Sequence, residues 1–466
     1  MRTNDFDIAI VGSGSAAFSG AIRASELGAR VAMVERGTVG GTCVNIGCIP
    51  SKAELAAAAQ RHRAARNPFP GVTTSADGVD LGALVAGKDE IVRSLRQERY
   101  LDLVEHYGFE LVTGTGQFAD PDTLLVDGQP LRADHYLLAT GASPAAPPVA
   151  GLDEVGYLTS TTALELTELP ERLVVIGGNY VGLEFAQLFA RLGSEVTVVE
   201  LLDRLAPFEE PEASEVVANV FASEGIRVVT GARVESVSRR AGEKVVHATV
   251  GGSEQHFRTE EVLVATGRRA NTSLLALERA GIATNGQGQV IVHPTLRTSN
   301  PRVFAAGDVT PAPQFVYVAA AMGAAAAENA LGEGERAIDY SALPRITFTS
   351  PQIAAVGLTD EQANEQGIEC SCRTLPLDYV PRALVERDTR GLAKLVIERG
   401  TRRIIGATVV AEGAGDVILA AVYAVQFGLT VDQVVGTWAP YLTMSEAFKL
   451  AAQAVDRQVA HLSCCA

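Results

Sequence analysis

One strand–turn–helix–strand pattern occurs twice in this sequence, and it constrains the fold more than any other feature. Residues 6–35 read as a strand, a glycine-rich turn, a helix and a second strand, and residues 172–200 repeat that order. In each copy an acidic residue closes the second strand at the same distance from the first glycine of the turn, from Gly12 to Glu35 and from Gly177 to Glu200. The repeat predicts two related α/β domains in one chain.

Each turn suits the pyrophosphate of a dinucleotide. Glycines let the backbone approach the phosphates, the following helix supplies N–H donors, and the acidic residue can hydrogen-bond a ribose hydroxyl. We therefore expect two Rossmann-like domains that bind two different nucleotides. The second turn has Asn in place of its second glycine, and Asn tolerates left-handed backbone. The expected contacts are Gly12, Gly14, Ala17 and Glu35 in the first copy, and Gly177, Asn179, Gly182 and Glu200 in the second.

Strand patterns after the two copies suggest how the domains are connected. Each copy is followed by a strand ending in Ala-Thr-Gly, and "NPRVFAAGDV" adds a strand after the second copy. This order suggests a first domain interrupted by the second. Beyond about residue 340, antiparallel strand patterns precede Ala-rich helices, which predicts an α+β dimerisation module. The expected segments are 1–143 and 271–340 for the first domain, 144–270 for the second, and 341–466 for the module.

Charge and hydropathy exclude several classes of partner. The chain carries 39 basic and 55 acidic residues, a net charge of −16, which disfavours nucleic acid and anionic membranes. No apolar run reaches the roughly 18 residues that a membrane span needs. The N-terminus has no signal-peptide pattern, so we expect a cytoplasmic protein.

Six cysteines occur as three close pairs, and one pair lies in "GGTCVNIGCIPSK". On a regular helix Cys43 and Cys48 would be about 7.5 Å apart along the axis, beyond easy disulfide reach. The flanking glycines allow a distorted segment that brings the thiols together. Ser51 and Glu54 fit a capping box, so a helix is expected to start just after Ser51. A helix N-terminus near Cys48 would lower the pKa of that thiol.

The first glycine-rich turn, the Cys43–Cys48 segment, the second turn, the Ala-Thr-Gly strand ends and "FAAGD" resemble motifs of one family. They are similar, also in their order along the chain, to those of the flavin-dependent pyridine nucleotide–disulfide oxidoreductases. The resemblance covers nearly the whole chain and implies that the first copy binds FAD and the second NAD(P)H. It implies that Lys52 lies near the flavin and pairs with Glu184, and that Tyr180 covers the flavin until nicotinamide displaces it. Cys48 would be the flavin-side thiol and Cys43 the outer thiol. Further contacts implied are Gly41, Thr42, Lys52, Thr140, Gly141 and Asp308 for FAD, and Tyr180, Arg204 and Gly267 for NAD(P)H.

The C-terminal segment departs from the disulfide-reducing members of that family. Those members carry a His-Pro-Thr-x-x-Glu segment whose His moves protons in thiol exchange. Counting back from Glu446, the His position is Tyr441. A phenol with a pKa of about 10 is a poor proton acceptor at neutral pH. The sequence does contain His-Pro-Thr at 293–295, but Thr298 stands there where the Glu would be. Ordinary disulfide reduction is therefore in doubt.

Cys464 and Cys465, next to the C-terminus, suggest a different substrate. Thiolates select soft cations, and mercuric ion prefers two sulfur ligands and accepts two electrons. We expect Hg(II), as a thiol complex, to pass from this pair to Cys43 and Cys48. The tail and "PYLTMSEAFKLAAQ" are similar to those of the mercuric reductases within the family. That resemblance implies a homodimer in which the tail and Tyr441 reach the partner's active site.

Alternatives stay open at this point. One is an NAD(P)H-dependent disulfide reductase of the dihydrolipoamide or glutathione type, and another is a flavoprotein that sequesters metal without turnover. NADPH and NADH are both kept, because Glu200 repels a 2′-phosphate and Arg204 could offset this. Cys370 and Cys372 are expected as a surface pair on one face of a strand, and Tyr317 as a core residue.

Overall fold

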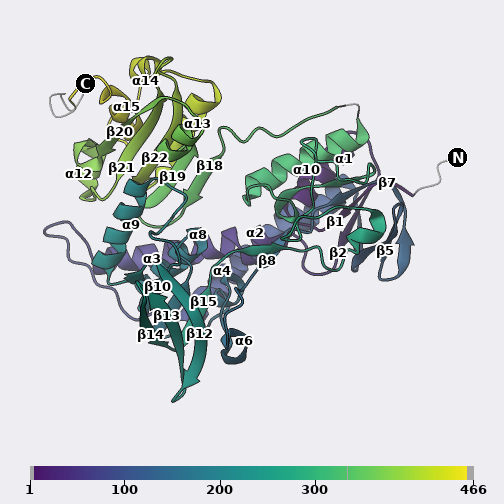
Figure 1. The fold of residues 1–466 in the computed structure, drawn as a ribbon, viewed down its shortest axis with the longest axis horizontal. Helices are drawn as coiled ribbons and strands as arrows, with labels where there is room; N and C mark the ends of the chain where they lie inside the picture. The colour runs from purple at the N-terminus through teal and green to yellow at the C-terminus, as the bar shows by residue number, and fades with distance from the viewer. Residues whose placement is uncertain (1–4, 333, 459–466) are drawn as a thin grey trace.

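The structure is a computed structural model that describes residues 5–332 and 334–458, and Figure 1 shows its three groups of sheets and helices. Two groups contain parallel sheets, and the third is built on an antiparallel sheet near the C-terminus. The predicted fold class, two Rossmann-like domains and a C-terminal α+β domain, is confirmed. No helix in the described ranges is long and apolar enough to cross a membrane.

The first parallel sheet has the strand order β17-β7-β1-β2-β3. Its central strand β1 (Phe6–Val11) is buried over its last four residues, as expected for a parallel strand covered on both faces. β17 follows the second copy of the repeat in sequence, yet it pairs with β7 of the first sheet. The chain therefore leaves this sheet and returns to it. The other strands are β2 (Val31–Glu35), β3 (Glu110–Thr113), β7 (Ala133–Leu138) and β17 (Val303–Ala305).

Two helices pack closely on this sheet, α1 (Ser15–Glu26) and the Ala-rich α10 (Val316–Leu331). A Cβ on Gly323 would lie 2.0 Å from the carbonyl oxygen of Ala16, so the two backbones touch and only glycine fits. Small residues thus allow α1, which follows the first glycine-rich turn, to pack directly against α10.

The second parallel sheet has the order β11-β10-β9-β15 and carries the second copy of the repeat. Helix α8 (Tyr180–Leu192) lies between β9 and β10 in sequence and is buried along most of its length. A three-stranded antiparallel sheet, β12-β13-β14, extends from this unit (Figure 1). The strands are β9 (Arg172–Ile176), β10 (Glu195–Val199), β11 (Arg227–Val229), β12 (Ala232–Arg240), β13 (Glu243–Val250), β14 (Ser253–Thr259) and β15 (Glu261–Val264).

The C-terminal unit is a five-stranded antiparallel sheet with the order β18-β19-β22-β21-β20. Helices α13 (Ala414–Gln426) and α15 (Glu446–Gln453) pack against it and bury a core of Ala, Val, Leu and Ile side chains. The strands are β18 (Pro344–Thr347), β19 (Gln352–Gly357), β20 (Cys370–Pro376), β21 (Leu392–Glu398) and β22 (Ile404–Ala411).

Two short antiparallel strands, β8 (Ala142–Pro144) and β16 (Arg268–Ala270), pair where the chain passes from the first unit to the second and back. The expected boundaries 143/144 and 270/271 fall in or next to these strands and stay predictions. The remaining elements are α2 (Gly41–Ile46), α3 (Cys48–Ala65), α4 (Leu81–Arg96), α5 (Asp102–Tyr107), α6 (Leu152–Val155), α7 (Ser160–Ala163), α9 (Pro211–Glu224), α11 (Asp360–Glu365), α12 (Pro381–Glu386), α14 (Val431–Gly436), β4 (Gly116–Asp120), β5 (Thr123–Val126) and β6 (Gln129–Leu131).

Candidate active site

The two thiols of the Cys43–Cys48 segment lie on consecutive helices separated by one residue. Cys43 lies in α2, and Cys48 is the first residue of α3. The break is at Gly47, where a Cβ would lie 2.9 Å from the carbonyl oxygen of Thr42. The kink brings the thiols within hydrogen-bonding reach, and both are free cysteines. The two thiols can therefore interact directly across the helix break.

The predicted capping box at Ser51 is wrong. Both of its residues lie inside α3, where Ser51 Oγ donates to the carbonyl of Cys48 at 3.3 Å. Glu54 is buried, with Lys88 Nζ at 3.9 Å, and burial raises its pKa to about 7. Pro50 accounts for the error, because a proline fits the first turn of a helix and lets the helix begin upstream of Ser51.

The thiols differ in acidity. Hydrogen bonding from Cys43 is the main reason why the pKa of Cys48 falls to about 7, with a further lowering by the charge of Lys52. The same hydrogen bond, followed by burial, raises the pKa of Cys43. The Cys48 thiol therefore titrates near neutral pH, and the Cys43 thiol stabilises its thiolate. In this chain Cys48 is exposed and Cys43 half-buried, and their assignment as flavin-side and outer thiol stays a prediction.

Lys52 connects this segment to the second parallel unit. Its Nζ lies 2.6 Å from Glu184 Oε2 on α8 and 4.7 Å from the centre of the Phe348 ring. The other carboxylate oxygen of Glu184 accepts from the backbone N–H of Phe348 at 2.9 Å. The ion pair expected between Lys52 and Glu184 is therefore present, and three units of the fold meet at it.

The first glycine-rich turn has the geometry of a phosphate-binding turn. Gly12 has φ +110°, and a Cβ there would lie 2.4 Å from the carbonyl oxygen of Ala139. Glu35, at the end of β2, accepts from Ser13 Oγ at 2.5 Å. A pocket at the carboxyl ends of the parallel strands has Gly12, Glu35 and Thr140 in its wall. This is where a dinucleotide binds in such sheets, so these residues fit an FAD adenosine.

The thiol segment lies directly against that turn. A Cβ on Gly41 would lie 2.5 Å from the Cα of Gly14, so the two backbones are in contact. Thr42 follows Gly41 in α2, and Ala17 is fully buried in α1. The contact places the two segments that are expected to hold FAD side by side.

A second polar group contains Asp308, which the family resemblance predicts to bind FAD. Asp308 lies beside the turn at Gly307, and its carboxylate is 3.8 Å from Arg268 Nε. Burial raises the pKa of Asp308, and Arg268 Nε is buried without a hydrogen-bond partner among the described residues. Unpaired polar atoms of this kind are expected where a polar cofactor supplies the partner. Gly141 and Gly267, at the two Ala-Thr-Gly strand ends, both have positive φ.

The second turn differs from expectation at Asn179. This residue has φ −109°, ordinary extended backbone, and the positive φ falls on Gly177 at +112°. Asn therefore replaces glycine without strain. A Cβ on Gly182 would lie 1.8 Å from the carbonyl oxygen of Gly177, so glycine is required there. Asn179 Oδ1 is buried without a partner in the described ranges, at the start of α8, where a pyrophosphate of NAD(P)H would bind.

Among the described residues, no hydrogen bond joins Glu200 to Arg204. Glu200 accepts from the backbone N–H groups of Gly178 and Leu202, at 2.5 and 2.7 Å. Arg204 donates to the carbonyls of Pro207 and Glu209, both at 2.7 Å. The acidic residue thus stays at the glycine-rich turn, while the guanidinium is held by the loop that follows.

An aromatic group lies between these turns and the C-terminal unit. The Tyr180 ring is 6.2 Å from that of Phe315, which stacks on Tyr317 at 5.3 Å. Burial raises the pKa of Tyr180 to about 12. The prediction that Tyr317 belongs to the core is wrong, because its side chain is 40% exposed and its hydroxyl donates to the Pro344 carbonyl.

The C-terminal residues are placed only in part. Tyr441 is 52% exposed between α14 and α15, and Glu446 Oε2 accepts from the N–H of Leu442 at 2.8 Å. Cys464 and Cys465 lie outside the described residues. His293 hydrogen-bonds Thr295 in a loop far along the chain from this segment.

Cys370 and Cys372 lie on β20, an edge strand, as expected for a surface pair. Cys370 Sγ is 3.2 Å from Asp360 Oδ1, and burial is the main reason why the pKa of Cys372 rises to about 12. These thiols are therefore protonated at neutral pH, unlike Cys48.

Sequence reasoning missed three residues near the thiols and Lys52, which are Tyr100, Arg268 and Phe348, and it assigned Tyr317 to the core. The charge of Cys48 contributes to the pKa shifts of Arg268 and Tyr317, and the charge of Cys43 to that of Tyr100. Arg268 follows an Ala-Thr-Gly strand end, and this position was a usable signal. Phe348 is separated from Glu184 by 164 residues and has no local signal.

Comparison with protein families gives two matches. Residues 6–323 match the family described as "Pyridine nucleotide-disulphide oxidoreductase", and residues 343–452 match its dimerisation domain. Together the matches cover both parallel units and the C-terminal sheet.

Curated relatives match over nearly the whole chain. A protein named mercuric reductase from Streptomyces lividans is 56% identical over 468 residues, covering 99% of this chain and 98% of the relative. One from Staphylococcus aureus is 50% identical and covers 100% of this chain and 85% of the relative. Among solved structures, the Cu(II) complex of the HOCl-induced flavoprotein disulfide reductase RclA from Escherichia coli is 30% identical. It has a TM-score of 0.88 and covers 97% of this chain and 100% of that one.

Proposed function

The chain belongs to the pyridine nucleotide-disulphide oxidoreductase family, and we propose that it is a mercuric reductase, which reduces Hg(II) to elemental mercury with NAD(P)H. One observation carries the proposal: the free thiols Cys43 and Cys48 meet at a helix break, and the pKa of Cys48 is lowered to about 7. Two neighbouring thiols suit a soft cation that prefers two sulfur ligands. The relatives that match over the whole chain carry the same activity in their names.

FAD, when bound, supplies a two-electron relay between NAD(P)H and the thiol site. The residues proposed to hold it are those of the first turn, the Gly41–Thr42 segment, and Asp308 with Arg268. The residues proposed for NAD(P)H are those of the second turn, with Tyr180, Glu200, Arg204 and Gly267.

The thiols perform the steps that belong to the protein itself. Their disulfide must first be reduced by two electrons and two protons. Cys48 thiolate and Cys43 then displace two thiols from an incoming Hg(II) complex, and Cys43 releases its proton to a leaving thiolate. Two further electrons reduce the bound ion to Hg(0), and both sulfurs are left as thiolates. Lys52 stays close enough to stabilise negative charge on Cys48 in each of these states.

Delivery of the ion is proposed to come from the partner subunit of a homodimer. Cys464 and Cys465 would exchange Hg(II) with small thiols and pass it to Cys43 and Cys48, so the ion keeps sulfur ligands throughout. Tyr441 would lie beside this path, where a phenol can donate a hydrogen bond but removes protons poorly. A cytoplasmic location, which would give access to NAD(P)H, stays a prediction.

The test is a substrate panel with the flavin-loaded enzyme. Oxidation of NADPH and of NADH is followed with Hg(II) in excess small thiol, then with oxidised lipoamide and oxidised glutathione. We expect turnover with Hg(II) and release of volatile mercury, and little turnover with either disulfide, because Tyr441 replaces the exchange base.

Two outcomes would contradict the proposal. Turnover with a disulfide and none with Hg(II) would indicate a disulfide reductase. Stoichiometric binding of Hg(II) without oxidation of either nucleotide would indicate sequestration. A Cys43→Ser, Cys48→Ser enzyme is the control, and it should bind FAD but turn over none of these substrates.

A further inference from the structure

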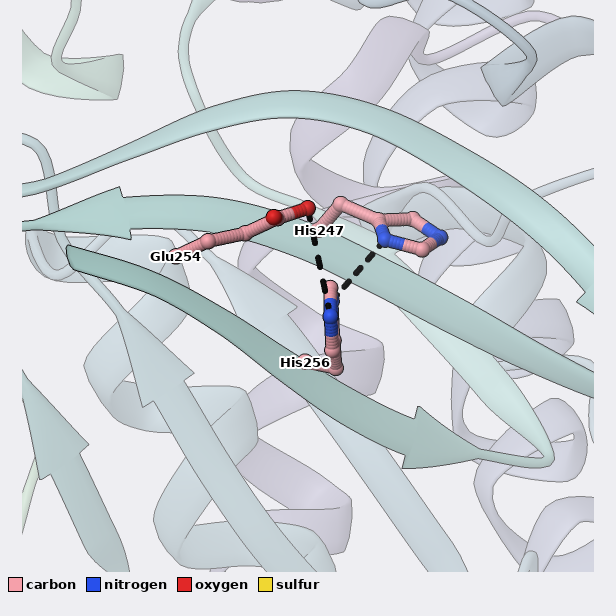
Figure 2. A group of neighbouring side chains, drawn as sticks. All are labelled: His247, Glu254 and His256. Atoms are coloured by element: carbon pink, nitrogen blue, oxygen red, sulfur yellow. Dashed lines mark hydrogen bonds and ion pairs between the residues drawn. The ribbon is translucent and has the colours of Figure 1, made fainter.

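A second cluster of ligating side chains lies on the antiparallel sheet β12-β13-β14. His247 on β13 and His256 on β14 are directly opposite each other in the strand register. Glu254 lies two positions before His256, so both side chains point to the same face of β14. Figure 2 shows the His256 ring joined by dashed lines to the carboxylate of Glu254 and to the ring of His247. No step of the thiol chemistry uses these residues.

The three side chains converge on one small space. His247 Nδ1 and His256 Nδ1 are 2.9 Å apart, and Glu254 Oε1 is 3.9 Å from His256 Nε2. One ligand atom from each residue lies within 4.8 Å of the others. Cross-strand partners have the closest side chains in a sheet, which is why two imidazoles from different strands can meet here.

A hydrogen bond from the third strand orients His247. Its Nε2 is 2.8 Å from Ser238 Oγ on β12. When Nε2 carries the ring proton and donates it to Ser238, Nδ1 carries the lone pair and faces His256 Nδ1. Metal-ligating histidines usually have their second nitrogen held in this way. The same face thus provides two imidazole nitrogens, a carboxylate and the group that sets one tautomer.

We propose that His247, His256 and Glu254 bind one divalent transition-metal ion, Zn²⁺ or Ni²⁺. Imidazole and carboxylate ligands suit these ions, and three protein ligands leave a fourth position for water. Two nitrogens about 2.0–2.1 Å from a tetrahedral ion lie roughly 3.3 Å apart. The observed 2.9 Å requires the rings to separate by a few tenths of an ångström, and the His256 side chain is 51% exposed.

The cluster contains no sulfur, which separates it from the thiol site. Hg(II) is expected at Cys43 and Cys48, whereas imidazole and carboxylate favour borderline ions. A bound ion would link β13 to β14 and stabilise the sheet of the second unit. It would leave the thiol chemistry unchanged, because none of its ligands contacts the thiol segment in the described chain. The inference therefore does not depend on the proposed reductase activity.

Ni²⁺ binding to the flavin-loaded enzyme tests the proposal. Calorimetric titration of the wild type is compared with His247→Gln and His256→Gln, and with His293→Gln as the matched control. We expect each cluster variant to bind one ion fewer per chain, or to bind at least tenfold more weakly, while His293→Gln behaves like wild type. Ser238→Ala should weaken binding by roughly tenfold, since it releases the second nitrogen of His247.

X-ray absorption at the nickel edge separates this site from the cysteines. We expect nitrogen and oxygen neighbours with imidazole scattering in the wild type. Sulfur ligands only, or the same stoichiometry and affinity in the wild type, His247→Gln and His256→Gln, would overturn the proposal. The melting temperature of each metal-free variant and its rate of NAD(P)H oxidation show whether a loss of Ni²⁺ binding reflects misfolding. An unchanged fold with undiminished Ni²⁺ binding in both cluster variants would also overturn it.

Discussion

Lys52 Nζ lies 2.6 Å from Glu184 Oε2, although 132 residues separate these two along the chain. The pair joins α3, which begins with Cys48, to α8, which begins at the second glycine-rich turn. The two charges act on Cys48 with opposite signs, because Lys52 lowers the pKa of that thiol and Glu184 raises it. The acidity of the thiol is therefore coupled to the contact between the two nucleotide-binding units.

Opposite shifts are expected when the two partners are neutralised one at a time. Lys52→Met should raise the pKa of Cys48 and slow its alkylation at pH 6 by roughly fivefold or more. Glu184→Gln should lower that pKa and speed alkylation at the same pH. Rates measured with iodoacetamide on reduced enzyme provide the check, with Lys244→Met as a control at a buried lysine that pairs with Glu261 in the second unit. Shifts of the same sign in both variants would contradict this account.

A pH profile should distinguish the two kinds of cysteine. The pKa of Cys48 is about 7, so its thiolate fraction and its alkylation rate should rise with pH and reach half-maximum near pH 7. Cys372, whose pKa is raised to about 12, should react far more slowly over the same range. Peptide mapping after timed alkylation measures both sites in one sample. A midpoint near pH 9 at Cys48 would show that neither Cys43 nor Lys52 stabilises the thiolate.

Local spacing was enough to predict the two glycine-rich turns, the thiol pair and the fold class, since each depends on residues close together in sequence. The helix start was mispredicted because Pro50 and Ser51 both favour a first turn, and spacing alone does not say which turn is first. Phe348 could not be found, because only tertiary packing brings the C-terminal unit to Lys52. Tyr317 was assigned to the core because its apolar neighbours on α10 conceal that its own side chain is exposed. Asn179 was misinterpreted because the left-handed residue of the second turn is Gly177.

The exposed apolar side chains of the C-terminal unit predict where the dimer forms. Leu419 and Tyr423 lie one turn apart on α13, and Phe427 follows as its C-cap; the three side chains are 50%, 53% and 72% exposed. Trp438, the only tryptophan, is 96% exposed. Burial of such a surface is the main driving force for a stable homodimer. Phe427→Glu should therefore dissociate the dimer and shift the Trp438 emission to longer wavelength.

Sedimentation and fluorescence of that variant are measured together with turnover of Hg(II). We expect turnover to fall at least tenfold, since the partner no longer supplies its tail. Val72→Glu, at an exposed apolar residue outside this unit, should leave both readouts unchanged. A Phe427→Glu enzyme that stays dimeric, with an unshifted emission, would place the interface elsewhere.

Glu200 should set the preference between NADH and NADPH. Its carboxylate lies at the glycine-rich turn of the second unit, where it favours a free ribose hydroxyl and repels a 2′-phosphate. Glu200→Gln should lower the ratio of kcat/KM for NADH to that for NADPH by roughly tenfold, about 1.4 kcal/mol. Glu35→Gln, at the matching position of the first unit, should weaken FAD binding and leave the ratio unchanged. An unaltered ratio in Glu200→Gln would show that the loop around Arg204 decides the preference.

Removal of the terminal thiols should impair delivery rather than reduction. Cys464→Ala, Cys465→Ala enzyme is expected to lose at least tenfold in kcat/KM for Hg(II) when excess small thiol competes for the ion. The reason is that the proposed exchange from thiol to thiol then lacks its first acceptor. Cys370→Ala, Cys372→Ala is the matched control, a thiol pair on the edge strand β20, and it should behave like wild type. Equal losses in both double variants would indicate a general effect of thiol content.

Mixed dimers decide whether the tail works across the subunit interface. One chain carries Cys464→Ala and Cys465→Ala, and the other carries Cys43→Ser and Cys48→Ser, so neither homodimer turns over Hg(II) efficiently in excess thiol. In the hybrid, the intact Cys43 and Cys48 of one chain face the intact tail of the other. Random mixing makes about half of the dimers hybrid, with one competent site of two, so about a quarter of wild-type activity is expected. If each tail served its own chain, mixing would restore nothing, and the proposed delivery between subunits would be wrong.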